Sequence, residues 1–309
     1  MGPERARTMP WNEARLLDWI ATWTRPDPLV GSRGHDAAVL ARPGARTVWC
    51  TDQAAVGVHA ANGVPPARLG AKAIARTASD LAATAAEPVG CLVALRAPAE
   101  TTERWIRAAL DGARRRADEL GLPIVGGDLA QVPGPASLAV SAFGRLPGRR
   151  RPPGRDRARA GQVLVATGPF GGSGLGRHLR IEPRLAAGRA LWAAGATAMM
   201  DVSDGLGIDA DRLARASGLE LVLERVPLHR DAARAARRSG RAALDHALGD
   251  GEDHELLATL PAAAAARLEG ELGLLRLGRV RAGRPGLVLD LGDPGRDGPW
   301  RGTGWVHGG

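Results

Sequence analysis

The chain has 309 residues, 44% of them hydrophobic, and a formal net charge of +9. A chain this long usually forms more than one core, and a change of composition near residue 150 predicts two domains, residues 1–148 and 149–309. No uncharged apolar run approaches the roughly 18–20 residues that a membrane helix needs, and the first residues lack the apolar core of a signal peptide. These features predict a cytoplasmic protein without membrane contact.

The positive charge is carried almost entirely by arginine, because Lys72 is the only lysine. Tyrosine is absent while alanine and glycine abound, which indicates a coding bias, so the charge says little about function. It would still attract anionic substrates such as nucleotides. Cys50 and Cys91, the only two cysteines, make neither a disulfide framework nor a zinc site, in keeping with a reducing compartment.

Helical and strand patterns alternate along the first half of the chain. The expected elements, in order, are a helix over 11–24, two short strands within 35–52, a small-residue helix over 67–86, a buried strand over 89–98, an amphipathic helix over 101–121, and strands over 123–130 and 136–148. Gly121 is expected to end the amphipathic helix as its C-cap.

A stretch rich in proline, glycine and arginine, residues 147–161, has no periodicity and predicts a linker or long loop. After it, the expected strands cover 162–168, 196–202, 219–224, 254–261 and two segments within 274–292. The expected helices cover 183–194, 206–217, 229–247 and 262–273, and the glycine-rich segment 170–179 leads into a further helix. Because strands and helices do not follow a strict parallel βαβ rhythm, an α+β fold with layers in both halves is expected.

Several aspartates recur at strand ends and turns, flanked by apolar residues: Asp36, Asp52, Asp128, Asp201 and Asp204; Asp80 lies within the small-residue helix. Each has an ordinary alternative; Ser203 or Asp204, for example, would be a suitable N-cap for a helix that begins at Leu206. Buried carboxylates are costly unless something pairs with them, and arginine is sparse in the sequence immediately beside these positions. Mg²⁺ is the natural partner, and dispersed carboxylates around several Mg²⁺ ions are typical of a phosphoryl-transfer site.

Two further aspartates follow in the same stretch. Asp209 lies near a helix start, where the helix dipole favours an anion, and its role stays open between local structure and function. Asp211 points away from the apolar stripe of the helix and is expected to be solvated.

The glycine-rich segment "GPFGGSGLG" lacks the Gly-Lys-Ser/Thr ending of a Walker A loop, and it is interpreted as a flexible turn before a helix. If ATP is bound, its phosphates must then be held by metal ions and by backbone groups outside the P-loop plan.

Seven motifs follow one another in order: "GHDAAVL", "TDQAAVGVHA", "LGAKAIARTASDLAATAAEPVG", "LPIVGGDLA", "MMDVSDGLGID", "GDGEDHELL" and "GTGWVH". In this order the sequence resembles the bacterial thiamine-monophosphate kinases, which belong to the superfamily of aminoimidazole ribonucleotide synthetase. The resemblance runs through nearly the whole chain. It implies a two-domain α+β fold whose N-terminal mixed sheet pairs in a homodimer, with ATP and thiamine monophosphate as substrates and several Mg²⁺ ions as cofactors.

The resemblance also implies roles for individual residues. Metal ligands or their close supports would be Asp36, Cys50, Thr51, Asp52, Asp80, Asp128, Asp201 and Asp204, of which Asp128 and Asp204 are the catalytic candidates. ATP would be bound by Gly127, Asp128, Arg155 and Ser203, and thiamine monophosphate by His59, Glu252 and Trp305. From the residues alone, three simpler roles stay open: a structural histidine for His59, a solvated turn for Glu252, and a hydrophobic plug for Trp305.

The sequence departs from the family's pattern at three places, one of which is the missing aromatic residue after His307. His35 replaces the first acid of a usual Asp-Asp pair, and Leu129, Ala130 and Gln131 replace two hydroxyl residues and an arginine. Alternatives are therefore another member of the superfamily, such as an aminoimidazole ribonucleotide synthetase, or a catalytically weakened homologue that binds nucleotide. A nucleic-acid binder using residues 148–161 is a third alternative, but carboxylate clusters repel phosphates unless metal intervenes, so no nucleic-acid partner is expected.

Overall fold

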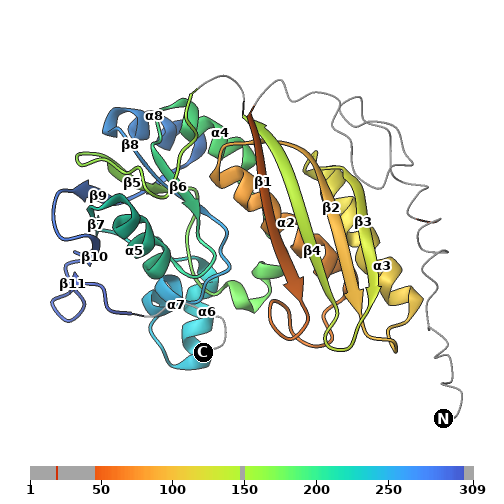
Figure 1. Cartoon of the computed structure of the whole chain (residues 1–309). Helices are drawn as coiled ribbons and strands as arrows, with labels where there is room; N and C mark the ends of the chain where they lie inside the picture. Colours follow the sequence, from red (N-terminus) through yellow and green to blue (C-terminus); the bar gives the residue numbers. More distant parts are fainter. Residues whose placement is uncertain (1–18, 20–45, 147–149, 303–309) are drawn as a thin grey trace, which may run out of the picture. The chain divides into compact units, whose positions relative to one another are not determined.

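The structure is a computed structural model that describes residues 19, 46–146 and 150–302, and the chain divides into two compact units (Figure 1). The first unit comprises Met1–Thr77 and Pro88–Gly144, and the second comprises Ala78–Glu87 and Arg145–Gly309. The expected α+β class is confirmed. The first of the two strands within 35–52 lies outside the described residues, and so does the expected helix over 11–24 except for Trp19, which is helical.

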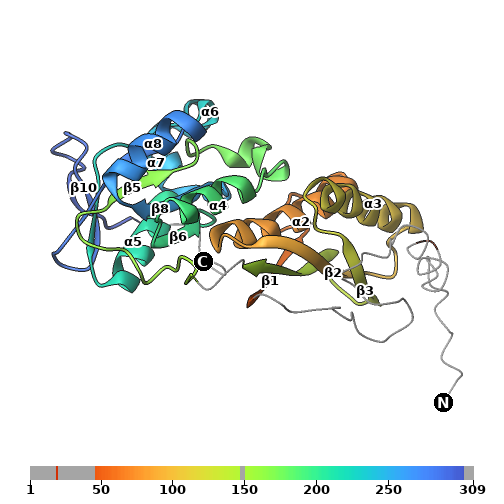
Figure 2. The same ribbon diagram turned by 90° about the horizontal axis from the view of Figure 1, so that it is seen from above.

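The first unit is built on a four-stranded sheet with the strand order β1-β4-β2-β3. This part of the chain forms β1 (Arg46–Ala55), α2 (Pro66–Ala83), β2 (Glu87–Ala97), α3 (Glu103–Glu119), β3 (Ile124–Gln131) and β4 (Ser137–Leu146), and the last residues of α2, from Ala78 on, belong to the second unit. Helices α2 and α3 lie on the same face of this sheet (Figures 1 and 2).

Small residues allow α2 and α3 to approach each other closely. A Cβ atom on Gly70 of α2 would come within 1.9 Å of the carbonyl oxygen of Ala109, and one on Gly112 of α3 within 2.1 Å of that of Ala67. Helix α3 begins where the Thr102 side chain accepts a hydrogen bond from the Trp105 backbone. Its C-cap is Leu120 rather than the expected Gly121, which follows with a φ of 63°.

The second unit holds a seven-stranded mixed sheet with the order β11-β10-β7-β9-β5-β8-β6. The pair β7–β10 is parallel, and the other neighbours are antiparallel. The elements are β5 (Val163–Ala166), η1 (Ser173–Leu175), η2 (Arg177–Leu179), α4 (Leu185–Ala193), β6 (Ala198–Asp201), α5 (Leu206–Ser217), β7 (Glu220–Leu223), α6 (Arg230–Ser239), α7 (Ala243–Gly249), β8 (Leu256–Leu260), α8 (Ala262–Leu272), β9 (Leu275–Arg281), β10 (Gly286–Leu289) and β11 (Gly298–Pro299).

Helix α5 shows how the core of this unit forms. Its apolar residues Leu206, Ala210 and Leu213 are fully buried and belong to the main hydrophobic cluster. The helix packs on β7 and β10, while α4 and α8 contact β8, β5 and β9. This burial fixes the strand end and loop that precede α5, where the candidate carboxylates lie.

Two expected elements differ from the structure. The segment 229–247 is two helices, α6 and α7, because Gly240 adopts a φ of 75° and ends the first one. The segment 170–179 forms two 3₁₀ turns instead of leading into an α-helix, since Gly171, Gly172 and Gly176 all have positive φ values.

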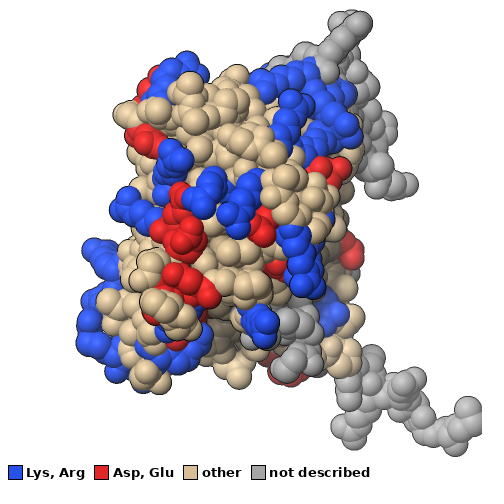
Figure 3. Space-filling model, turned by 90° about the vertical axis from the view of Figure 1, so that its left-hand side faces the viewer, with Lys and Arg blue, Asp and Glu red and all other residues tan. Residues whose placement is uncertain are grey.

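Within the described part of the chain, no helix is long and apolar enough to cross a membrane. On the face drawn in Figure 3, basic and acidic side chains are interspersed.

Candidate functional site

Asp201, the last residue of β6, is buried in the second unit with 3% of its surface exposed. Its Oδ2 atom accepts hydrogen bonds from Ser79 Oγ at 2.7 Å and from His254 Nδ1 at 3.1 Å. Burial by itself raises the pKa of Asp201, but the His254 and Ser79 hydrogen bonds and the charge of Arg155 outweigh it and hold the pKa below its ordinary value. Asp201 is therefore a carboxylate held ionised in a fixed orientation.

The loop after Asp201 is organised by Asp209 from inside α5. The Asp209 Oδ2 atom accepts the backbone N–H of Ser203 at 3.0 Å and that of Asp204 at 2.9 Å. The N-cap of α5 is Gly205, with no side-chain capping bond, so the capping role considered for Ser203 or Asp204 is wrong. Asp209 holds Ser203 and Asp204 through their backbone N–H groups and not through their side chains.

Arg212 completes this loop from one turn further along α5. It donates to Asp209 Oδ1 at 3.1 Å and also pairs with Asp204 Oδ2. Burial raises the pKa of Asp209 to about 6, because its bonds to the loop backbone and the charge of Arg212 only partly compensate for desolvation. Asp209 thus holds the loop in position, and the sequence alone left this role open.

Glu252 lies directly beside this loop. Its backbone N–H donates to the Ser203 carbonyl at 2.7 Å, and the next residues continue the contact, since the His254 N–H donates to Val202 O at 2.8 Å. A Cβ atom on Gly251 would come within 2.6 Å of Ser203 O, so glycine is needed for this close approach. The structure therefore brings a predicted nucleotide residue and a predicted substrate residue together.

Two other predicted residues belong to the surroundings of Asp201. Asp80, near the end of α2, directly follows Ser79, whose hydroxyl donates to Asp201. Arg155 is exposed, and its charge acts on Asp201. The second unit thus gathers the segments that carry Asp80, Arg155 and Asp201 with the loop at Ser203.

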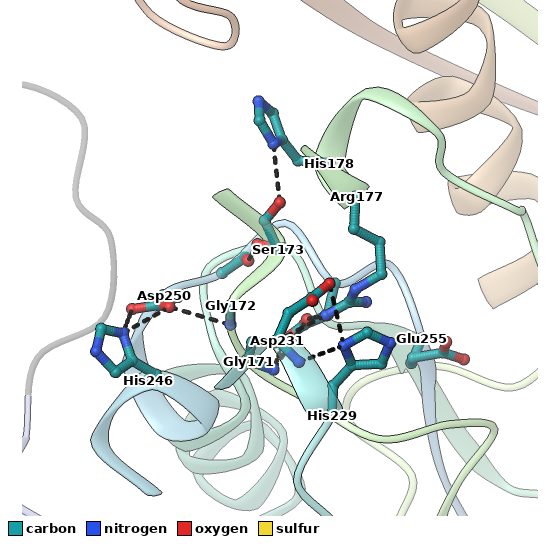
Figure 4. A network of polar contacts seen from close by, with 12 residues as sticks. Gly171, Gly172, Ser173, Arg177, His178, His229, Asp231, His246, Asp250 and Glu255 are labelled. Atoms are coloured by element: carbon teal, nitrogen blue, oxygen red, sulfur yellow. Dashed lines mark hydrogen bonds and ion pairs between the residues drawn. The ribbon is translucent and has the colours of Figure 1, made fainter. Parts of the chain in front are cut away.

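Next to Glu252, a network of polar contacts holds the glycine-rich segment (Figure 4). The Gly171 N–H donates to both Asp253 oxygens at 3.1 and 3.2 Å, and the Gly172 N–H donates to Asp250 at 3.2 Å. Ser173 Oγ donates to the Gly251 carbonyl at 2.5 Å. These amides already have carboxylate partners, unlike those of a P-loop, and the segment is anchored rather than the flexible turn that was expected.

Asp253 itself is an ion-pair partner in this network. Arg177 Nη2 lies 2.6 Å from Asp253 Oδ1. Burial raises the pKa of Asp253 to about 6, with the charge and hydrogen bond of Arg177 opposing the shift. Glu255, two residues on, is held by Arg184 through bonds of 2.8 and 2.6 Å and by Thr167 at 2.6 Å.

In the first unit, three predicted metal residues follow one another on β1. The carboxylate of Asp52 accepts hydrogen bonds from Arg76 Nε at 2.9 Å and from Arg76 Nη2 at 3.2 Å. Thr51 Oγ1 donates to the Val140 carbonyl at 3.2 Å, and Cys50 Sγ contacts the Thr77 carbonyl at 3.4 Å. The side chains of Cys50 and Thr51 are engaged with neighbouring backbone, and Asp52 with a cation.

His59 is buried in the same unit. Its Nδ1 atom accepts the Ala55 N–H at 3.1 Å, which places the ring proton on Nε2, and its carbonyl accepts a hydrogen bond from the buried Lys72. These bonds give His59 the structural role considered from the sequence, and its predicted contact with substrate stays a prediction.

Gly127 and Asp128 lie on β3, opposite Val93 and Ala94 of β2. A Cβ atom on Gly127 would come within 1.9 Å of the Val93 carbonyl oxygen, so the strand requires glycine there. Asp128 is exposed, which leaves its carboxylate accessible to a ligand. Leu129, one of the departures from the family's pattern, is buried.

Two sequence expectations are wrong. Arginines are not sparse around the candidate carboxylates, because helix spacing and chain folding bring Arg76 to Asp52 and Arg212 to Asp204. Asp211 is not simply solvated: its Oδ1 accepts the Leu287 N–H at 3.0 Å and so ties α5 to β10. Asp36, His35 and Trp305 lie outside the described residues.

Sequence reasoning missed three residues that position Asp201 and its loop: Ser79, Arg212 and His254. Arg212 follows Asp209 by three residues, a helical spacing that signals a pair. His254 follows Glu252 within a motif already singled out, but its contact with Asp201 spans 53 positions. No local pattern predicts that contact.

Comparisons with known proteins agree with this architecture. Residues 34–146 match the family model for the AIR synthase related protein, N-terminal domain. The thiamine-monophosphate kinase of Rhodopirellula baltica is 38% identical over 291 residues, 89% of this chain and 91% of that protein. The Mycobacterium tuberculosis enzyme of the same name is 35% identical over 90% of this chain and 87% of its own length.

Solved structures point the same way. The thiamine-monophosphate kinase of Stenotrophomonas maltophilia superposes with a TM-score of 0.77 at 31% identity, covering 90% of this chain and 96% of that one. The complex of AaThiL with AMPPCP and TMP gives 0.76 at 27% identity, covering 99% and 100%. Escherichia coli HypE, a hydrogenase maturation protein, gives 0.77 at 17% identity over 96% and 99%, which shows a shared fold alone. By its identity to curated relatives over almost its whole length, the chain belongs to the thiamine-monophosphate kinase family.

Proposed function

We propose that the protein transfers the γ-phosphoryl group of ATP to the phosphate of thiamine monophosphate, giving thiamine diphosphate. The observation that carries the proposal is the gathering of Asp201, Ser203 and Glu252 in one part of the second unit of a chain that belongs to this family. The relative solved with AMPPCP and TMP supports the choice of the two substrates.

Mg²⁺ ions are part of the proposal, and the donor set suits them. Mg²⁺ typically takes one or two carboxylates and completes its shell with water and phosphate oxygens. Among the described residues, no group of three or more metal-binding side chains converges, so these side chains supply only part of a coordination shell. Asp128, Asp201 and Asp204, with Asp36, Asp52 and Asp80, are the proposed ligands or supports, whereas a Cys50 thiol is too soft and would serve through its backbone.

Bound Mg²⁺ would neutralise negative charge on the phosphates of ATP. The protein's own contribution is to position the reactants. Asp201 is held by His254 and Ser79, and the backbone of Ser203 and Asp204 is held by Asp209. The attacking group is a phosphate oxygen that is already anionic, so no strong general base is needed and catalysis rests on orientation and charge.

In the second unit, Arg155 and Ser203 are the proposed ATP-binding residues, and in the first unit the proposed ATP-binding residues are Gly127 and Asp128. Glu252 accepts a hydrogen bond from the aminopyrimidine ring of the substrate, and Trp305 stacks on the flat or cationic part of it. His59, in the first unit, is a further proposed substrate residue.

Formation of thiamine diphosphate from ATP, Mg²⁺ and thiamine monophosphate, followed by chromatography, tests the proposal. Product that depends on all three components is expected. ATP binding without any product would contradict it and would favour the weakened nucleotide-binding homologue that the Leu129-Ala130-Gln131 replacement suggests.

The homodimer, the domain boundary at 148/149 and the cytoplasmic location also stay part of the proposal. Trp49 on β1 is 60% exposed in the described structure, and an apolar side chain of this size on a sheet face suits burial against a second copy. Light scattering of the purified protein should give a molar mass of about twice that of the monomer, which is 32.1 kDa.

A further inference from the structure

Three side chains near the end of α6 and along α7 form a hydrogen-bonded chain that the proposed kinase site does not use. Ser239 Oγ lies 2.7 Å from His246 Nε2, and His246 Nδ1 lies 2.8 Å from Asp250 Oδ2 and 2.9 Å from Asp250 Oδ1. Figure 4 shows the His246–Asp250 part of this chain. The order of the groups is hydroxyl, imidazole, carboxylate.

The direction of these hydrogen bonds follows from the chemistry of the groups. An ionised carboxylate only accepts hydrogen bonds, so His246 Nδ1 carries the ring proton and donates it to Asp250. His246 Nε2 then holds a lone pair and accepts the hydroxyl proton of Ser239. This is the protonation pattern in which an imidazole takes a proton from a serine nucleophile while a carboxylate keeps the ring oriented.

Both ends of the chain are supported. The Asp250 Oδ2 atom also accepts the Gly172 N–H at 3.2 Å, which fixes the carboxylate. The Arg241 N–H donates to Ser239 Oγ at 3.1 Å, which helps to hold the hydroxyl in position. His246 is buried, whereas Ser239 is exposed and accessible to a reactant.

Close to Ser239 in the sequence are three arginines that line a pocket. A cavity of about 290 Å³ is lined by Leu175, Arg234, Arg237 and Arg238, and Ser239 directly follows the last of these. Arg234 pairs with Asp231 at 3.2 Å. In the described structure, Arg237 and Arg238 make no ion pair with a carboxylate, so they are available to an anionic group of a ligand.

We propose that Ser239, His246 and Asp250 form a second reactive site, separate from the kinase site, with Ser239 as a nucleophile toward esters that carry an anionic group. Ser239 Oγ attacks the ester carbonyl carbon while its proton moves to His246 Nε2. The bond from that carbon to the leaving oxygen breaks, and the leaving oxygen takes the proton from His246. Water then cleaves the acyl-serine with the same proton transfers, so one ester and one water give one acid and one alcohol.

The same contacts also join α6 to α7, and a purely structural network is the alternative. A structural network requires the three groups to be bonded, but it makes no prediction about reactivity. A reactive site and a purely structural network can therefore be distinguished by whether Ser239 reacts with an electrophile faster than other serines do.

A fluorophosphonate probe added to the full-length protein measures this reactivity. Wild type is expected to be labelled at Ser239, identified by peptide mass spectrometry, and Ser239→Ala is expected to lose the label. His246→Gln should slow labelling at least 100-fold, since it removes the general base. Asp250→Asn should slow it at least tenfold, because a neutral amide no longer stabilises the positive charge that His246 gains when it takes the serine proton.

Absence of label on Ser239 in the wild type would overturn the proposal, as would equal labelling in a folded His246→Gln protein. Thermal unfolding of each variant shows whether it is folded, and the exposed Ser239→Ala variant provides a test that does not depend on changing a buried residue. Thiamine diphosphate formation by Ser239→Ala should equal that of wild type, so failure of this proposal and failure of the kinase proposal are distinguishable.

The ligand preference is tested with two chromogenic esters, neutral p-nitrophenyl acetate and anionic mono-p-nitrophenyl succinate. The anionic ester is expected to be hydrolysed with at least tenfold higher kcat/KM, and Arg237→Gln with Arg238→Gln should remove that preference without changing fluorophosphonate labelling. Equal hydrolysis of the two esters by the wild type would contradict the anionic preference.

Discussion

The two units hold their candidate carboxylates in different ways. On the sheet of the first unit, Asp128 is exposed, and Asp52, whose side chain is 25% exposed, accepts hydrogen bonds from Arg76 and from the adjacent Gln53 N–H. In the second unit, Asp201 and Asp209 are buried, and each accepts hydrogen bonds from at least two separate groups. A carboxylate fixed by several donors keeps one orientation before any ligand arrives, whereas an exposed one is ordered by the ligand itself. The candidate carboxylates of the second unit are therefore oriented before a ligand binds, whereas those of the first unit are accessible to it.

The largest effect on activity is expected from a substitution at Asp204, a candidate catalytic carboxylate of the second unit. Asp204→Asn should lower kcat for thiamine diphosphate formation at least 100-fold, because it removes a charge proposed to act on the metal-bound phosphates. Circular dichroism should show an unchanged fold, since the backbone of residue 204 is still held by Asp209. Asp211→Asn is the matched control, because its amide oxygen still accepts from Leu287, and its kcat should stay within about twofold. Unchanged turnover in Asp204→Asn would show that this aspartate has no catalytic role.

A second variant tests whether the first unit is as rigid as its sheet suggests. Gly127→Ala should lower the free energy of unfolding by roughly 2–4 kcal/mol, because the new Cβ atom would meet the Val93 carbonyl oxygen. Gly126→Ala is the neighbouring control: its Cβ would meet only the Leu92 side chain at 3.1 Å, which can turn away. Urea unfolding of both variants checks the difference, and an equal loss in the two would mean that the strand adapts to the new side chain.

Part of this arrangement was predictable from the sequence. The apolar stripe of Leu206, Ala210 and Leu213 predicts α5 over 206–217, the range found in the structure. Strand-end aspartates next to glycine or serine also stand out, because they recur along the chain, although each one alone has an ordinary structural explanation. The single helix over 229–247 was wrong since its composition is helical on both sides of Gly240, and only the backbone at that residue separates α6 from α7.

The partners of the carboxylates were harder to predict. Asp209 binds the N–H groups of residues 203 and 204, which lie before the helix in a loop whose path is set by packing against 248–251. The contacts of Asp201 with Ser79 and His254 join residues 122 and 53 positions apart. Such contacts follow from the tertiary fold, and local periodicity carries no information about them.

The pH dependence of stability separates the two buried aspartates of the second unit. The pKa of Asp209 is raised by burial to about 6, above the ordinary value of 3.8, so the folded state binds its proton more tightly than the unfolded state. Stability from this group is therefore full below about pH 4 and is lost as the pH rises through about 6. Relative to wild type, Asp209→Asn should gain on the order of 1–3 kcal/mol between pH 4 and pH 7 in metal-free buffer.

Urea unfolding at several pH values measures this difference. A stability difference between Asp209→Asn and wild type that stays constant from pH 4 to pH 7 would contradict a raised pKa for this carboxyl. Asp201 should give the opposite sign, because its pKa is lowered by His254 and Ser79 despite burial, and its contribution is lost as the pH falls.

The smallest effect is expected at the ion pair between Arg76 and the candidate carboxylate Asp52 in the first unit. Arg76→Gln removes the bonds of 2.9 and 3.2 Å to Asp52, whose side chain is 25% exposed, so water can solvate the carboxylate that remains. The free energy of unfolding should therefore fall by only about 0.5–1 kcal/mol, the size of a partly exposed pair. If Asp52 is instead as dependent on its donors as Asp201, the loss will exceed about 2 kcal/mol, as it does when a buried charge loses its partner. In that case the first unit pre-organises its acids as well, and the difference between the two units rests on Asp128 alone.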